Sequence, residues 1–258
     1  MEHLKGIIRA RRAASTTLLA ALTRCDALSQ EISESRLATS WLREIEASAE
    51  IYPFGWYQPP PHGMSVLIGT APSYARLEYE SLRDVVNWPA PDVLFSEEAV
   101  LYPYFSSIDR RTGMIGDFVG TFYRGHNLAI REWIKEAYDT SIQISAFACV
   151  GRRLCEVYDF ADEVMRAKGS RNNTLSVTSG TGPGADIGHT IPGFRGDLGD
   201  LSRTSQTDFS RLISKNRQFV TAENSYQIDS GTAFTIEPQM LLQGLPMASF
   251  HVIVAFDG

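Results

Sequence analysis

Helical and strand-forming segments follow one another in this sequence in an order that few folds accommodate. Residues 1–50 have the apolar spacing of two amphipathic helices that break near Cys25, and residues 127–168 have that of two more that break at Val150–Gly151. A hairpin is predicted between the two helix pairs, and further strands after the second pair. The order helices, hairpin, helices and then strands predicts an α+β fold.

The strand-forming segments are rich in aromatic and β-branched residues. VLYPYFSSID (100–109) and GMIGDFVGTFYRG (113–125) lie on either side of the turn RRTG, which is the pattern of a β-hairpin. Later segments of the same composition are TLSVTS (174–179), TAFTIEP (232–238) and MASFHVIVAF (247–256). The sequence therefore predicts strands in both halves of the chain.

Two stretches have the composition of loops. Residues 52–91 hold seven prolines and many aromatics, and we expect a long ordered loop with one short strand at Ser65–Gly69. Such a rigid, aromatic loop is suited to shaping a pocket. Residues 195–220 form a polar insertion with one short helix.

We expect the second helix of the chain to begin after an N-cap at Ser29.

The composition excludes some classes of protein. A net charge of −6 gives no basic surface for nucleic acid, and three cysteines in 258 residues favour a reducing compartment over a disulfide framework. No apolar run approaches the ~20 residues of a membrane span. The basic residues of the first segment also suit a transit peptide, but its apolar spacing favours a structural helix. We expect a cytoplasmic protein with a single domain over residues 1–258, without nucleic-acid or membrane partners.

Four polar residues lie where burial is costly without a partner. Asp117 lies in an otherwise apolar strand, Glu237 follows FTI, and His251 lies within SFHVIVAF. His189 lies in DIGHTIPGF, which glycine and proline make too broken for a helix. Burial of all four around one cation explains them together. Taken singly, a strand Asp also caps turns, a Glu before Pro also faces water, and a lone His is more often a hydrogen-bonded core residue.

Four motifs follow one another along the chain: GDFVGTFYRG, CVGRRLCEVYDFADEVMRAKG, IGHTIPG and SGTAFTIEP. In the same order they resemble the strand D-x-T-R-T-F-x-x-G, the helix P-G-x-x-x-x-E-V, the segment GHGIG and the strand G-M-x-F-T-I-E-P of the creatinase, methionine aminopeptidase and prolidase family, peptidase family M24. The resemblance covers roughly residues 1–258. It implies the pita-bread fold, which is a curved antiparallel sheet flanked by helices.

The resemblance also implies a metal site that is incomplete. In active peptidases of that family two Asp, one His and two Glu hold two adjacent divalent metals that activate a water. Asp117 takes the second Asp position, His189 the His position and Glu237 the first Glu position. Ser106 stands where the first Asp is expected, and the terminal strand offers Ser249 or His251 in place of the last Glu.

Loss of two carboxylates disfavours a two-metal site. Asp109 is no substitute for the missing Asp, because a regular strand directs residues 106 and 109 to opposite faces. Asp117, His189, Glu237 and His251 still form a reasonable set for one Mn, Fe, Co or Zn ion. The alternative is no metal, since creatinase works without one on the same fold.

Other residues take roles only through the resemblance. HTIP also resembles the later HExP motif, in which His binds substrate; His189 would then be a substrate-side acid or base, and Thr181 would occupy the ligand position. His62 in PPPHGM resembles the HG that precedes the hairpin in methionine aminopeptidases, where it would donate a proton to the leaving nitrogen. Three aromatic residues are expected to line the substrate pocket: Trp56, Tyr57 and Tyr102.

These residues predict an M24-like hydrolase that cleaves a C–N bond in a peptide or a small amide or amidine, with a mononuclear or metal-free site. The substrate is a small molecule or peptide, and a homodimer is a further expectation. The alternatives are a metal-independent enzyme with His189 as general base, a lyase-type enzyme, and a pita-bread domain that has lost catalysis and only binds.

Overall fold

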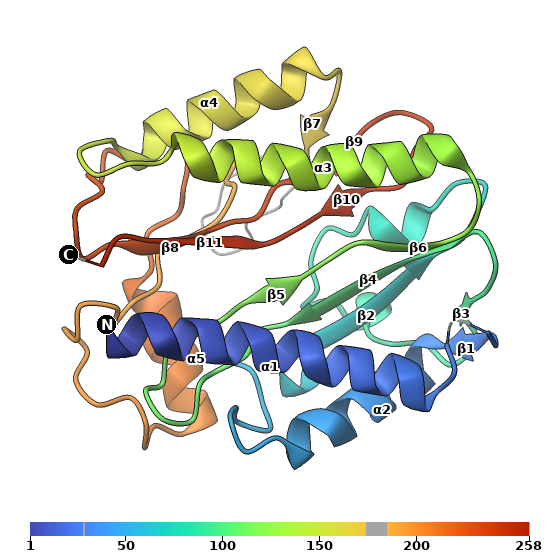
Figure 1. Cartoon of the computed structure of the whole chain (residues 1–258), viewed down its shortest axis with the longest axis horizontal. Helices are drawn as coiled ribbons and strands as arrows, with labels where there is room; N and C mark the ends of the chain where they lie inside the picture. Colours follow the sequence, from blue (N-terminus) through green and yellow to red (C-terminus); the bar gives the residue numbers. More distant parts are fainter. Residues whose placement is uncertain (28, 174–184, 258) are drawn as a thin grey trace.

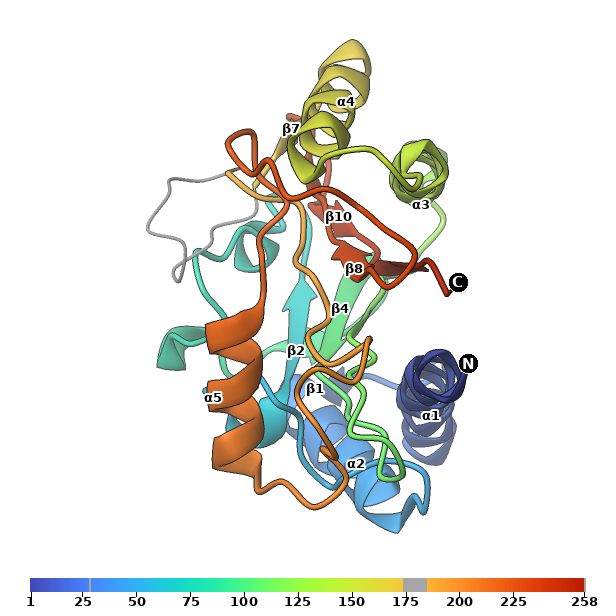
Figure 2. The same ribbon diagram turned by 90° about the vertical axis from the view of Figure 1, so that its left-hand side faces the viewer.

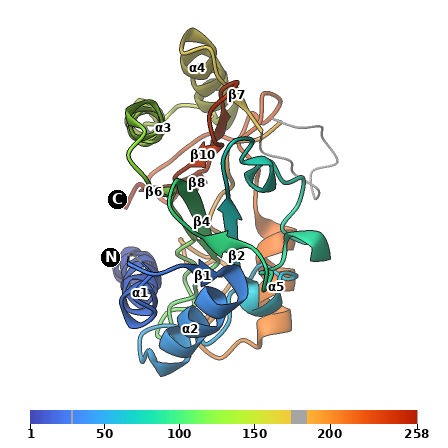
Figure 3. The ribbon, with the colours of Figure 1, turned by 90° about the vertical axis from the view of Figure 1, so that its right-hand side faces the viewer.

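The computed structural model describes residues 1–27, 29–173 and 185–257. Two pairs of helices border a central layer of strands, and Figure 1 shows one pair above the strands and the other below them. Figures 2 and 3 show the first and third helices on one side of the strands and the fifth on the other. The helices are α1 (Glu2–Arg24), α2 (Glu34–Ala47), α3 (Leu128–Phe147), α4 (Leu154–Ala167) and α5 (Gln206–Asn216), with 3-10 turns η1 (Pro61–Gly63), η2 (Ala75–Leu77) and η3 (Val85–Asn87).

The strands are short and antiparallel. They are β1 (Ile32–Ser33), β2 (Met64–Gly69), β3 (Leu94–Phe95), β4 (Ala99–Phe105), β5 (Phe118–Val119), β6 (Phe122–Arg124), β7 (Arg171–Asn172), β8 (Ala233–Ile236), β9 (Gln239–Leu241), β10 (Ala248–Ser249) and β11 (Val252–Ala255). The predicted α+β class is confirmed.

The two predicted helix pairs are confirmed, with breaks close to the expected residues: α1 ends before Cys25, and α3 and α4 are separated by the turn around Gly151. The predicted N-cap at Ser29 is wrong. Ser33 caps α2, and its Oγ accepts a hydrogen bond from Arg36 N at 3.3 Å. The helix begins late because residues 32–33 first pair with β3, a long-range contact without a local signal.

Four strands of the first half form one sheet around β4, and β1 pairs with β3 in a separate two-stranded sheet. That strand pairs antiparallel with β2 on one edge and with β5 and β6 on the other. The predicted hairpin is therefore confirmed, and its turn is closed by a 2.8 Å hydrogen bond from Asp109 N to Met114 O. The short strand expected at Ser65–Gly69 is β2, which begins one residue earlier.

The second half pairs β8 with β11, and β9 with both β7 and β10. TAFTIEP and MASFHVIVAF thus form strands as predicted, whereas TLSVTS lies outside the described residues. The short helix expected within 195–220 is α5. Residues of α1 and α2 pack on β2 and β4, and residues of α3 and α4 pack on β8, so each half has its own apolar core. Among the described residues, no helix is both long and apolar enough to cross a membrane.

Glu34, the first residue of α2, fastens this helix to the first sheet. Its side chain is fully buried, and its Oε1 accepts hydrogen bonds from Ile68 N and from Arg76 Nε, each at 2.6 Å. Its Oε2 accepts from Arg76 Nη2 at 2.6 Å and from Ala90 N at 2.9 Å. One carboxylate therefore joins a helix, a strand and two loop segments in the core.

Candidate metal centre

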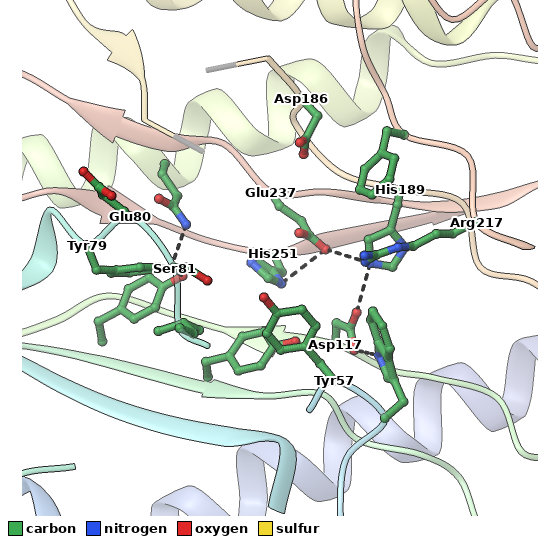
Figure 4. A pocket seen from close by; sticks show the side chains of 16 residues that line it. Tyr57, Tyr79, Glu80, Ser81, Asp117, Asp186, His189, Arg217, Glu237 and His251 are labelled. Carbon is green, nitrogen blue, oxygen red and sulfur yellow. Dashed lines mark hydrogen bonds and ion pairs between the residues drawn. The ribbon is translucent and has the colours of Figure 1, made fainter. Parts of the chain in front are cut away.

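A cavity of about 100 Å³ lies where the two halves of the chain meet. Figure 4 shows carboxylates, histidines and aromatic rings pointing into it from both sides. The residues that the sequence singled out and that line it are Trp56, Tyr57, Tyr102 and Asp117 from the first half, and His189, Glu237 and His251 from the second.

Three of these side chains form a compact cluster. Asp117, His189 and Glu237 each place one potential ligand atom within 4.8 Å of the others. His189 Nε2 lies 3.4 Å from Asp117 Oδ2 and 3.8 Å from Glu237 Oε1. Donor atoms bound to one ion at about 2.0–2.2 Å lie roughly 3–3.5 Å from one another. The 3.4 Å pair lies within this range and the 3.8 Å pair just beyond it, so the cluster is close to the spacing of ligands around a single cation.

Asp117 is held from two sides at the residue before β5. Trp56 Nε1 donates a 2.7 Å hydrogen bond to Oδ1, which leaves Oδ2 on the side of His189. Arg11 of α1 donates to the backbone oxygen of the same residue. The indole thus fixes the carboxylate, as outer partners do in metal sites, and the guanidinium fixes the backbone that carries it.

His189 has its ring nitrogens fixed by a neighbouring carbonyl. Its backbone N–H donates to Thr235 Oγ1 at 3.0 Å, and its Nδ1 lies 2.9 Å from Thr190 O. Because a carbonyl only accepts, Nδ1 carries the hydrogen, and in the neutral ring Nε2 presents its lone pair. That lone pair faces the carboxylates of Asp117 and Glu237.

The charges of the cluster shift the pKa values of its members. Burial alone lowers the pKa of His189, but the contact with Asp117 and the charge of Glu237 outweigh burial, so the pKa is raised. Burial raises the pKa of Glu237, against the attraction of His189 and with the repulsion of Asp117. A positive charge among these three groups is thus favoured.

His251 lies beside the cluster, between β10 and β11. Its Nδ1 is 3.5 Å from Glu237 Oε1, but it is not within the 4.8 Å group of three. Burial, and then the positive charges of Arg11 and His189, hold the pKa of His251 well below its ordinary value. Its predicted role as a metal ligand stays a prediction, whereas its neutral state follows from its surroundings.

The buried, neutral His251 makes the metal-free protein sensitive to acid. The unfolded chain takes up this proton near pH 6.5 and the folded protein only at lower pH, so stability is present above about pH 6.5 and is lost as the pH falls toward the folded pKa. We expect His251→Phe to reduce that loss by up to about 1.4 kcal/mol per pH unit. Urea unfolding of chelated protein between pH 7 and 5 measures it, and equal slopes for both proteins contradict it.

The position of the missing Asp is occupied by a structural serine. Ser106 is fully buried, its Oγ donates to Gly63 O at 2.9 Å, and it accepts from Tyr57 N at 3.0 Å. Asp109 lies apart from the cavity, where it binds Arg9 Nε at 2.8 Å and closes the hairpin turn through Thr112. Neither supplies a second pair of metal ligands.

The structure brings together most of the predicted site residues. Trp56, Tyr57 and Tyr102 line the cavity, as expected for substrate contacts, and their binding role stays a prediction. His62 is exposed at η1 and does not line the cavity, so its predicted proton donation gains no support from the geometry and stays a prediction. Thr181 lies outside the described residues.

Two arginines, one buried and one half-buried, were not anticipated. Arg217 lines the cavity, with its guanidinium 5.1 Å from the Trp56 ring centroid and 4.6 Å from that of Phe219, and burial lowers its pKa. It lies in a segment that reads as a polar insertion, without a local signal. Arg11 donates to Asp117 O and His251 O. Arg11 lies four residues after the buried Ile7, on the apolar face of α1, and this spacing could have predicted its inward direction.

Comparison with known proteins identifies the fold. The sequence matches no protein-family model and no curated protein. Solved structures do match: X-Pro aminopeptidase from Thermotoga maritima (TM-score 0.67, 13% identity, 100% of this chain and 59% of that chain) and prolidase from Pyrococcus furiosus (TM-score 0.66, 12% identity, 100% and 62%). Methionine aminopeptidase from Thermotoga maritima matches with a TM-score of 0.63 and 13% identity, over 98% of this chain and 94% of its own.

The chain therefore has the pita-bread fold of these peptidases, as its motifs predicted. It spans 59% of the length of the X-Pro aminopeptidase. At 12–13% identity the likeness establishes the fold alone, and the chemistry has to be argued from the cavity.

Proposed function

We propose that the protein is a hydrolase that cleaves a C–N bond in a peptide or small amide, with one divalent metal ion held by Asp117, His189 and Glu237. The observation that carries the proposal is the direction of His189 Nε2, whose lone pair faces two carboxylates at 3.4 and 3.8 Å. Three electron-rich atoms this close repel one another unless positive charge lies between them. A divalent cation supplies that charge.

The donor set fits such an ion. Imidazole and carboxylate oxygen are ligands that Mn, Fe, Co and Zn share. The ligands also have the outer partners typical of metal sites: Trp56 on Asp117 and the Thr190 carbonyl on His189. When bound, the ion would supply Lewis-acid activation of a water and of the scissile carbonyl.

The chain's own residues prepare the cavity for this chemistry. Aromatic rings line the cavity, and the Trp56 ring stands edge-on to His189 with centroids 5.4 Å apart. His251 is neutral and 3.5 Å from Glu237, so it adds no positive charge beside the ligands. Arg217 adds a positive charge to the wall, which suits an oxygen that becomes negative during the reaction.

A metal-free enzyme with His189 as acid and base is the second candidate. The raised pKa of His189 favours it, because a proton on Nε2 offsets the same repulsion between the lone pair and the carboxylates. Asp117 would then orient the imidazolium from 3.4 Å. The two candidates differ in whether chelation stops turnover.

Metal content tests the proposal directly. We expect the purified protein, loaded with Mn²⁺ or Zn²⁺ and desalted, to retain about one ion per chain by elemental analysis. Asp117→Asn and Glu237→Gln should lose it, and Asp159→Asn, an exposed acid on α4, should not. Hydrolysis of a panel of dipeptides and aminoacyl amides should stop on chelation and return with metal. Turnover that survives chelation rejects the metal-dependent form and supports the metal-free one.

A further inference from the structure

Gln239 lies on the same wall of the cavity as a member of the cluster. It is the first residue of β9 and follows Glu237 by two positions, with Pro238 between them. In an extended segment, side chains two residues apart face the same side. Both Glu237 and Gln239 accordingly line the cavity.

Hydrogen bonds hold both the side chain and the backbone of Gln239. Its Nε2 donates to Tyr79 Oη at 2.7 Å, and Tyr79 Oη donates to Tyr102 Oη at 2.8 Å. Its backbone N donates to Asn172 Oδ1 at 3.1 Å, and its backbone oxygen accepts from Asn173 N at 2.8 Å. Because the NH₂ group is bound to Tyr79, the orientation of the side-chain carbonyl is fixed.

No donor for that carbonyl lies in the described ranges of the chain. Gln239 is 8% exposed, and its Oε1 has no hydrogen-bond partner within the described part of the chain. A buried acceptor left unsatisfied costs about 1–3 kcal/mol. In a cavity wall, such an acceptor is satisfied by what enters the cavity, and its chemistry calls for an N–H or O–H donor.

The charge around this carbonyl selects between donors. Figure 4 places Tyr79 and Glu80 at one end of the cavity and His189 and Arg217 at the other. Glu80 lines the cavity at the Tyr79 end, and Gln239 is bound to Tyr79, so the acceptor lies at the end of Glu80 and away from Arg217. The carboxylate of Glu80 gives that end of the wall a negative charge. A cationic donor is favoured over a neutral or anionic one.

We propose that Gln239 determines specificity, because its Oε1 accepts a hydrogen bond from an ammonium or amidinium group at the end of the substrate away from the reacting bond. The inference rests on the proposed function for the position of that bond, at the Asp117, His189 and Glu237 cluster. The Tyr102–Tyr79–Gln239 chain holds the acceptor in place, and the carboxylate of Glu80 supplies the complementary charge.

Calorimetric titration with n-butylammonium, butyrate and butanol tests this subsite. We expect the wild type to bind butylammonium in preference to the other two. Gln239→Met keeps the length of the side chain and removes the acceptor, and should weaken butylammonium binding about ten- to a hundredfold. Gln239→Glu keeps an acceptor oxygen and should retain binding. Gln243→Met, the same change at an exposed position just after β9, should match the wild type.

Equal affinity of the wild type and Gln239→Met for butylammonium overturns the proposal, and so does a preference for butyrate or butanol. Absence of butylammonium binding to the wild type, as when water alone satisfies the acceptor, also overturns it. Thermal unfolding confirms that each variant is folded. The titrations are run on chelated and on metal-loaded protein and need no turnover, so the subsite can fail while hydrolysis stands, or stand while hydrolysis fails.

Discussion

Replacing His189 by alanine is expected to lower C–N bond hydrolysis by at least about a thousandfold. The imidazole supplies the only nitrogen in the Asp117, His189 and Glu237 group. Metal activation contributes several kcal/mol to a hydrolytic transition state, and each 1.4 kcal/mol is about tenfold in rate. The loss should appear in kcat, measured with the best substrate of the dipeptide and amide panel at saturating metal.

Two further variants make this result interpretable. Trp56→Phe keeps an aromatic ring but removes the N–H that orients Asp117 at 2.7 Å, and should cost about ten- to a hundredfold, as outer partners of metal ligands do. His126→Ala replaces an exposed histidine and should leave kcat unchanged. Near wild-type turnover by His189→Ala would falsify both the metal-dependent and the metal-free proposals, because each assigns His189 the central role.

Replacing Glu34 by alanine is expected to destabilise the folded protein by about 3–5 kcal/mol, the usual cost of breaking a buried ion pair from one side. The change leaves the guanidinium of Arg76 without its carboxylate and removes the acceptor of Ile68 N and Ala90 N. A loss of this size is a large part of the stability of an ordinary domain. Urea unfolding at pH 7 measures it.

The comparison for Glu34 is a surface ion pair. Glu50 binds Arg12 at 2.9 Å, with side chains 42% and 62% exposed. Glu50→Ala should therefore cost no more than about 1 kcal/mol. Glu34→Gln keeps the shape of the side chain and should fall between the two. Similar losses for Glu34→Ala and Glu50→Ala would show that the Glu34 contacts do not stabilise the fold.

What the sequence predicted depends on the range of the interactions involved. The helix pairs, the hairpin and α5 follow from local spacing, and their positions were predicted closely. Asp117, His189 and Glu237 were recognised through short motifs. They converge because the fold places these motifs around one cavity. The start of α2 was misplaced because it depends on pairing of β1 with β3, some sixty residues further along the chain.

The remainder of the site was hidden because its residues act through distant partners. Arg217 lines the cavity because its guanidinium packs on the rings of Trp56 and Phe219. Gln239 stands out because its Oε1 has no hydrogen-bond partner among the residues that the structure describes, and this is visible only once its Nε2 is seen to bind Tyr79. No periodicity or motif encodes either contact.

Arg11 links α1 to the segment between β10 and β11. It donates to the backbone oxygen of His251, 240 residues later, as well as to that of Asp117. The guanidinium is therefore synthesised 240 residues before its second acceptor. The contact between α1 and the segment before β11 forms only after residue 251 has been made, when Asp117, His189 and Glu237 are already in the chain.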